Sequence, residues 1–189
     1  MKLPKYLIII VLLIYSCNGE KDKIMTFYNI EQAIKAPKET KGLRITKDDL
    51  KTFEEHLNLF SNLEFLVIAN KKWVVVNYDG KIDPNTIEKI TLPSNISRLK
   101  SLRILILDNY YIDALPNDIS LLDKLEEMKL SYTSQVNLNA EVNKIRTLKS
   151  LREIDLTNST ITPQVIRNAF KELPSVNLTI FHGDIEPQY

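Results

Sequence analysis

The sequence of 189 residues has little of several residue types on which particular protein classes depend. Its single cysteine excludes a disulfide framework and any four-cysteine zinc module. Two histidines leave little material for a histidine-rich metal site, and four glycines exclude a collagen-like chain. The formal net charge is only +1, so the surplus of lysine and arginine that phosphate binding requires is missing. We therefore expect no metal and no nucleic acid partner.

What the chain does contain is typical of a folded protein. Hydrophobic residues make up 44%, charged residues 26% and aromatic residues 8% of the sequence. This balance excludes a disordered polyampholyte and a low-complexity chain, because enough apolar surface is present to form a core. The length suits one domain, or one domain preceded by an export segment.

The first residues have the organisation of an export signal. Lys2 and Lys5 precede an uninterrupted apolar run at 7–14, LIIIVLLI. A transmembrane helix needs about 20 apolar residues, so this run is too short to span a bilayer and fits a signal peptide. We predict a signal peptide at 1–16 and a polar tether at 17–25.

The end of this segment resembles the lipobox of bacterial lipoproteins. Ile14-Tyr15-Ser16-Cys17 has an aliphatic residue three positions before the cysteine and a small residue directly before it, although Tyr15 is larger than usual. The resemblance implies lipidation of Cys17 and cleavage before it. Because Asn18 is not aspartate, it also implies an exported protein anchored in the bacterial outer membrane. An ordinary secretory signal with an incidental cysteine is the alternative.

The rest of the chain contains an internal repeat. Residues 96–109 and 145–158 share eight of 14 positions at an offset of 49, which equals about two periods of 24. The pattern LxxLxL recurs with its second leucine position at residues 43, 66, 105, 128, 154 and 178. Four of the five spacings lie between 23 and 26 residues. From residue 40 to 181 the chain therefore resembles leucine-rich-repeat proteins, whose period is 20–29 residues.

The repeat predicts an α/β fold, namely a leucine-rich-repeat solenoid with a curved parallel sheet and short helices and turns on its convex side. Side chains alternate along a strand, so the two leucines of LxL point inward and stack on those of the neighbouring repeat. We predict an amino-terminal capping helix at 26–39, with Phe27, Ile30, Ala33 and Ile34 on one face, and the repeat domain at 40–183. Residues 184–189 form a tail.

Two return segments are predicted to be helical. Thr46 can cap a helix at 48–59, with Asp49 completing a capping box. Thr162-Pro163 precedes the second helix, at 164–173, and places proline at the first helical position. One spacing of 39 residues, from Leu66 to Leu105, exceeds the others and predicts an insertion near 71–91.

No pattern in the sequence indicates catalysis or a cofactor. GxGxxG, GxxxxGK[ST], GxSxG and HExxH are all absent. His56 and His182 are expected to be solvated surface residues. We therefore expect a non-enzymatic protein without a cofactor.

The concave face of the sheet is the predicted binding site. Side chains between the inward leucines point there, and those of the second and third copies are apolar. An exposed apolar patch often marks an interaction site, and aromatic residues suit hot spots. The alternative is that the insertion folds over this patch. The predicted partner-binding residues are Phe65, Val67, Ile104, Ile106, Asp108, Lys129, Tyr132 and Asp155, with Trp73, Tyr110 and Tyr111 as further aromatic anchors.

These observations favour a lipid-anchored, exported module of the bacterial cell envelope that binds a protein or a glycan. We expect a monomer or a weak homo-oligomer. A structural or self-associating envelope protein without an external ligand is the alternative, in which the last strand at 178–181 pairs edge to edge. An immunity or chaperone-like role toward a co-exported partner is a third possibility.

Overall fold

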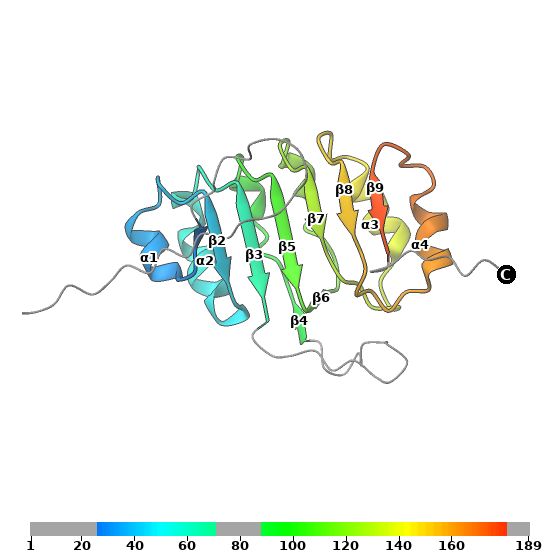
Figure 1. The fold of residues 1–189 in the computed structure, drawn as a ribbon, viewed down its shortest axis with the longest axis horizontal. Helices are drawn as coiled ribbons and strands as arrows, with labels where there is room; N and C mark the ends of the chain where they lie inside the picture. The colour runs from blue at the N-terminus through cyan, green and yellow to red at the C-terminus, as the bar shows by residue number, and fades with distance from the viewer. Residues whose placement is uncertain (1–25, 71–87, 181–189) are drawn as a thin grey trace, which may run out of the picture.

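A parallel sheet is the central feature of the described part of the protein. The computed structural model describes residues 26–70 and 88–180. Its seven-stranded sheet has the order β1-β2-β3-β5-β7-β8-β9, and the strands lie side by side across the molecule (Figure 1). The strands are β1 (Thr26–Phe27), β2 (Gly42–Ile45), β3 (Phe65–Ala69), β5 (Ile104–Asp108), β7 (Glu127–Lys129), β8 (Glu153–Asp155) and β9 (Asn177–Thr179). The predicted signal peptide, the tether with Cys17, and the tail at 184–189 lie outside the described residues.

The register of the sheet confirms the repeat. The residues at the second leucine position are direct partners across every strand pair from β2 to β9: Leu43, Leu66, Leu105, Met128, Ile154 and Leu178. All except the half-buried Leu178 are buried in one continuous core. Each inward side chain therefore packs between those of the adjacent repeats, and burial of each contributes roughly 1.5–3 kcal/mol. This arrangement is a leucine-rich-repeat solenoid.

The long spacing of 39 residues does not interrupt the sheet. β3 pairs directly with β5, with Leu66 opposite Leu105. Behind them β4 (Glu88–Ile90) pairs in parallel with β6 (Tyr110–Ile112) in a second sheet of two strands. The predicted insertion near 71–91 is therefore wrong at its end, since 88–90 form a regular part of the repeat. Residues 71–87, including Trp73, lie outside the described residues.

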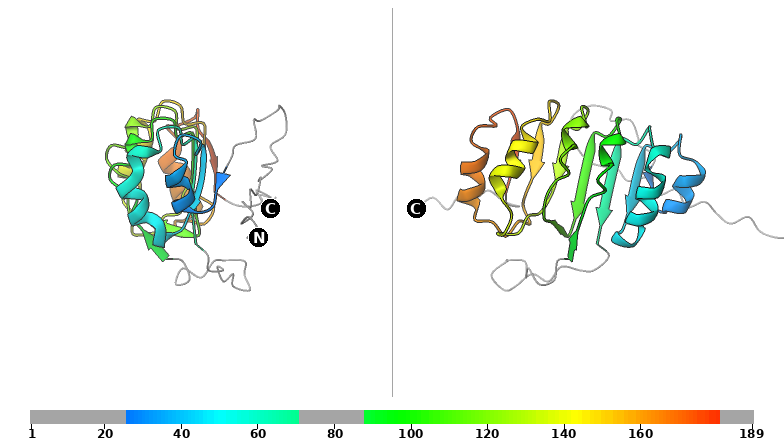
Figure 2. Two further views of the ribbon diagram at one scale, coloured as in Figure 1. Left: turned by 90° about the vertical axis from the view of Figure 1, so that its left-hand side faces the viewer. Right: turned by 180° about the vertical axis from the view of Figure 1, so that it is seen from behind.

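Short helices cover one face of the sheet (Figure 2). The predicted helix at 48–59 is a continuous series of η1 (Lys47–Asp49), α2 (Leu50–His56) and η2 (Leu57–Leu59). It starts at the predicted capping box, in which the Asp49 carboxylate accepts hydrogen bonds from the Thr46 N–H and hydroxyl at 2.9 and 2.8 Å. The predicted proline start of α4 (Pro163–Phe170) is also present, although this helix ends before Leu173. The other back elements are α3 (Leu138–Ile145), η4 (Ile96–Arg98) and η5 (Ile119–Leu121), and the sequence analysis did not predict α3.

The amino-terminal cap differs from the predicted helix at 26–39. The helix α1 covers only Ile30–Lys35, and it begins at Ile30 because the Asn29 side chain caps it by accepting a hydrogen bond from the Gln32 N–H at 3.1 Å. Phe27 lies in β1, which adds a strand to the sheet. Gly42 of β2 permits this pairing, since a Cβ atom there would overlap the Thr26 side-chain oxygen and come within 3.1 Å of the Thr26 Cα.

A row of alternating charges crosses the starts of the strands. Lys41, Glu64, Arg103 and Glu126 directly precede β2, β3, β5 and β7, and Arg152 continues the alternation before β8. Glu64 Oε1 lies 3.2 Å from Lys41 Nζ, and two Arg103 nitrogens donate to Glu126 at 3.1 Å. The hydrogen bond to Glu126 raises the pKa of Arg103. We call these five residues the charge ladder. Each exposed pair stabilises the fold little. Together the five favour one order of repeats, because like charges on adjacent strands repel.

Candidate functional site: the concave face of the sheet

The face of the sheet opposite the helices carries its own apolar cluster. Phe65, Val67 and Ala69 of β3 pack together, with Ile104 and Ile106 of β5 against them. This cluster is separate from the main core because alternate side chains of a strand point to opposite faces. The register places Phe65 opposite Ile104 and Val67 opposite Ile106, as the sequence pattern predicted. We call these five residues the concave apolar patch.

The patch is less open than the sequence analysis anticipated. Phe65 is 6% exposed and Val67 is 4% exposed, so neither offers much surface to a partner. Ile104 and Ile106 are only partly buried. The accessible part of the patch therefore lies on β5 rather than on β3, and the expectation that Phe65 and Val67 contact a partner directly is wrong for this conformation.

Charged residues flank the patch on both sides. Arg44 of β2 reaches across β3 and lies 3.6 Å from Asp108 of β5, and on the carboxy-terminal side of the patch Lys129 Nζ lies 3.9 Å from Asp155. Asp155 also accepts hydrogen bonds from the N–H and the hydroxyl of Thr157. Three predicted site residues, Asp108, Lys129 and Asp155, thus share the face of the patch.

Tyr132 is not on this face. It is 0% exposed and belongs to the main core. The two-residue alternation that sends Met128 and Leu130 inward continues to Tyr132, so its assignment to the concave side was wrong. Its hydroxyl donates to Glu141 at 3.3 Å, and burial, reinforced by the Glu141 charge, raises the pKa of Tyr132 well above its ordinary value.

Two further proposed aromatic anchors, Tyr110 and Tyr111, were also assigned wrongly. Tyr110 and Tyr111 are each 2% exposed in β6, away from the concave face. The Tyr110 hydroxyl accepts a hydrogen bond from the Lys47 N–H at 3.2 Å. These tyrosines support the fold and cannot act as contacts for a partner.

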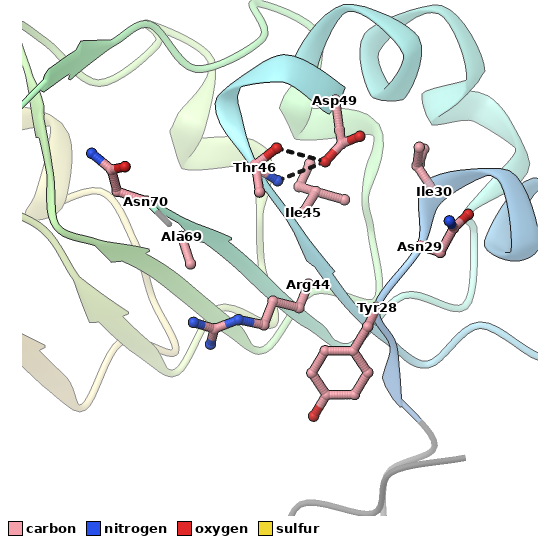
Figure 3. A pocket seen from close by; sticks show the side chains of 9 residues that line it. All are labelled: Tyr28, Asn29, Ile30, Arg44, Ile45, Thr46, Asp49, Ala69 and Asn70. Carbon is pink, nitrogen blue, oxygen red and sulfur yellow. Dashed lines mark hydrogen bonds between the residues drawn. The ribbon is translucent and has the colours of Figure 1, made fainter. Parts of the chain in front are cut away.

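Sequence reasoning overlooked a hollow beside the patch. A cavity of about 340 Å³ lies between the start of α1 and the ends of β2 and β3 (Figure 3). It is lined by Tyr28, Asn29, Ile30, Arg44, Ile45, Thr46, Asp49, Ala69 and Asn70. Asp49 and Asn29 already cap helices and Arg44 lies 3.6 Å from Asp108, so Tyr28, which is 40% exposed, is the side chain best placed to meet a ligand. Arg44 sits between the inward Leu43 and Ile45, and that position in the repeat was the signal that could have identified it.

Within 26–70 and 88–180 no group of three or more histidine, cysteine, aspartate or glutamate side chains is placed to hold a metal ion. The His56 ring contacts the Thr52 carbonyl at 2.9 Å on helix α2 and is half-buried. In the same two segments, every helix falls short of the length and hydropathy of a membrane span.

Comparison with known proteins finds similarity to solved structures. No protein-family model and no curated protein matches the chain. A solved structure of a leucine-rich-repeat protein from Leptospira interrogans aligns with 25% sequence identity and a TM-score of 0.45 over 67% of this chain. The aligned part is 33% of that protein, so this chain spans about a third of its length. The assignment of the fold rests on the strand register of the chain itself.

Proposed function

We propose that this protein is a non-catalytic leucine-rich-repeat module that binds another protein through its concave face. The observation that supports this most is the concave apolar patch, which lies outside the main core and leaves Ile104 and Ile106 partly open. The patch residues pack on one another and not on the main core, and partially open apolar surface bordered by charges is typical of interaction sites. A glycan would use the same face with fewer apolar contacts.

The test is a capture experiment with matched arginine substitutions. Ile106→Arg places a charge in the patch, and Leu121→Arg places the same charge on the opposite side, where Leu121 of η5 is 49% exposed. We expect the wild type and Leu121→Arg to capture the same partner from envelope extract, and Ile106→Arg to lose it. Equal capture by both variants, with unchanged circular dichroism spectra, would refute binding at the patch.

We also propose that a lipid on Cys17 anchors the protein in the bacterial envelope, at the outer membrane. The support is the lipobox-like sequence Ile14-Tyr15-Ser16-Cys17 after a short apolar run. Two or three acyl chains anchor stably, whereas one binds only marginally. Cys17→Ser should therefore move the protein from the membrane pellet to the soluble fraction. Continued sedimentation with membranes at high salt would contradict lipid anchoring.

The alternative is self-association without an external ligand. β9 is the terminal strand of the described sheet, and no described strand pairs with its outer edge. An open edge can pair with a second copy. Light scattering over a wide concentration range separates the two functions, because edge pairing predicts a dimer that Thr179→Pro abolishes, whereas the concave-face proposal does not require one.

A further inference from the structure

One pair of neighbouring residues on the concave face breaks the charge pattern found elsewhere in the sheet. Glu127 of β7 and Glu153 of β8 are direct register partners and point to the same face. Neither carboxylate makes a hydrogen bond or an ion pair with any residue of 26–70 or 88–180. Glu127 contributes only a weak Coulombic attraction to Arg103, whose guanidinium is already held by Glu126 and Glu64.

This arrangement destabilises the fold, whereas the neighbouring charged pairs of the concave face do not. Like charges directly opposite each other on adjacent strands are destabilising. Around this pair the ion pairs join opposite charges, as in Lys129 with Asp155 two residues farther along the same strands. Local rules of stability are broken in natural proteins mainly at functional sites. The unpaired carboxylates are therefore better explained by a ligand than by the fold.

The position of the pair identifies what such a ligand would carry. Glu127 lies directly opposite Ile104, so the two carboxylates continue the accessible part of the apolar patch without a gap. Building on the function proposed above, we infer that the partner is a protein segment that places an apolar side chain on Ile104 and Ile106 and a lysine or arginine between Glu127 and Glu153. Complementary charge at such a border confers specificity and speeds association.

The test removes the charges and leaves the shape. Glu127→Gln/Glu153→Gln neutralises the pair with isosteric amides. The probe is a short acetylated, fluorescein-labelled peptide of alternating leucine and lysine, and its counterpart has glutamate in place of lysine. Two exposed ion pairs together correspond to roughly tenfold in affinity. We expect fluorescence anisotropy to show binding of the lysine peptide to the folded protein, about tenfold weaker binding to the double variant, and weakening by salt.

A matched control separates this role from the fold. Glu64→Gln makes the same chemical change in the charge ladder, away from the concave face, where Glu64 contacts Lys41 and Arg103. It should lower the melting temperature and leave peptide affinity within about twofold. The double variant should instead keep or raise the melting temperature, because it relieves repulsion.

Several results would overturn the inference while leaving the proposed function intact. These are equal affinity for the lysine and glutamate peptides, no binding of the lysine peptide, or unchanged affinity in the double variant. Capture of a partner that is lost on Ile106→Arg yet insensitive to the double variant would show a concave-face site without a cationic ligand. Capture of a glycan whose binding does not change with salt concentration would also show a concave-face site without a cationic ligand.

Discussion

Replacement of Glu141 by alanine should destabilise the protein strongly, although it removes no apolar contact. Glu141 of α3 is 3% exposed, and its Oε2 accepts hydrogen bonds from the Leu115 N–H at 2.6 Å and from the Tyr132 hydroxyl at 3.3 Å. Its Oε1 accepts from Lys144 Nζ at 2.8 Å. This one carboxylate therefore joins three successive segments of the solenoid.

The size of the loss in stability follows from the hydrogen-bond donors that the substitution leaves without an acceptor. A buried donor without an acceptor costs about 1–3 kcal/mol, and Glu141→Ala creates two, on Leu115 and Tyr132. Lys144 adds little, because its side chain is 21% exposed and still donates to the Leu115 carbonyl at 2.7 Å. We expect a loss of about 3 kcal/mol in the free energy of unfolding.

Urea unfolding followed by circular dichroism measures this loss. The control is Glu172→Ala, which removes an exposed carboxylate that accepts from Arg146 at 2.8 Å and should cost under about 1 kcal/mol. Glu141→Gln retains one acceptor oxygen and should fall between the two. If Glu141→Ala and Glu172→Ala unfold at the same urea concentration with equal slopes, the assigned role of the buried carboxylate is wrong.

Three further predictions concern the core and the cap. Because the pKa of Tyr132 is raised in the fold, the unfolded state loses this proton first, so stability should fall as pH rises above about 10. Tyr132→Phe should make that alkaline loss shallower, and an unchanged pH slope in urea titrations would contradict it. Leu105→Ala should cost about 2–5 kcal/mol, since Leu105 is fully buried between neighbouring repeats, and a calorimetric shift of only a degree or two would be inconsistent. Gly42→Ala should loosen β1 from the sheet, seen as faster amide hydrogen exchange at Phe27, whereas unchanged protection there would show that Thr26 adapts.

The sheet could be predicted because its signal is periodic. The spacing of the second leucine position predicted β2, β3, β5, β7, β8 and β9 and their common register, since an inward leucine must meet its counterpart in the next repeat. It did not predict β4 and β6, which form the second sheet. β1 was not predicted, because a strand of two residues, Thr26 and Phe27, is too short to show a periodic pattern. Helix α3 was missed although Leu138, Val142 and Ile145 have helical spacing. Its buried Glu141 has no signature in a single sequence, because only the fold brings its donors together.

The candidate site was predicted in part for the same reason. Alternation placed Ile104, Ile106, Lys129 and Asp155 correctly on the concave face. Tyr132 was assigned to the same face, although the alternation from Met128 and Leu130 places it inward. Alternation left the burial of Phe65 as an open alternative, since it gives the face of a side chain but not its exposed fraction.

The alternating signs of the charge ladder favour an even number of coils whenever coils are gained or lost in evolution. Deleting or duplicating one complete coil would bring two cations or two anions together at the strand starts, for example Lys41 beside Arg103. Two coils could be gained or lost together without that penalty. Extra residues outside the sheet leave the alternation intact, as the direct pairing of β3 with β5 illustrates. Relatives of this protein should accordingly differ in length by pairs of coils, or by loops of any size, more readily than by a single coil.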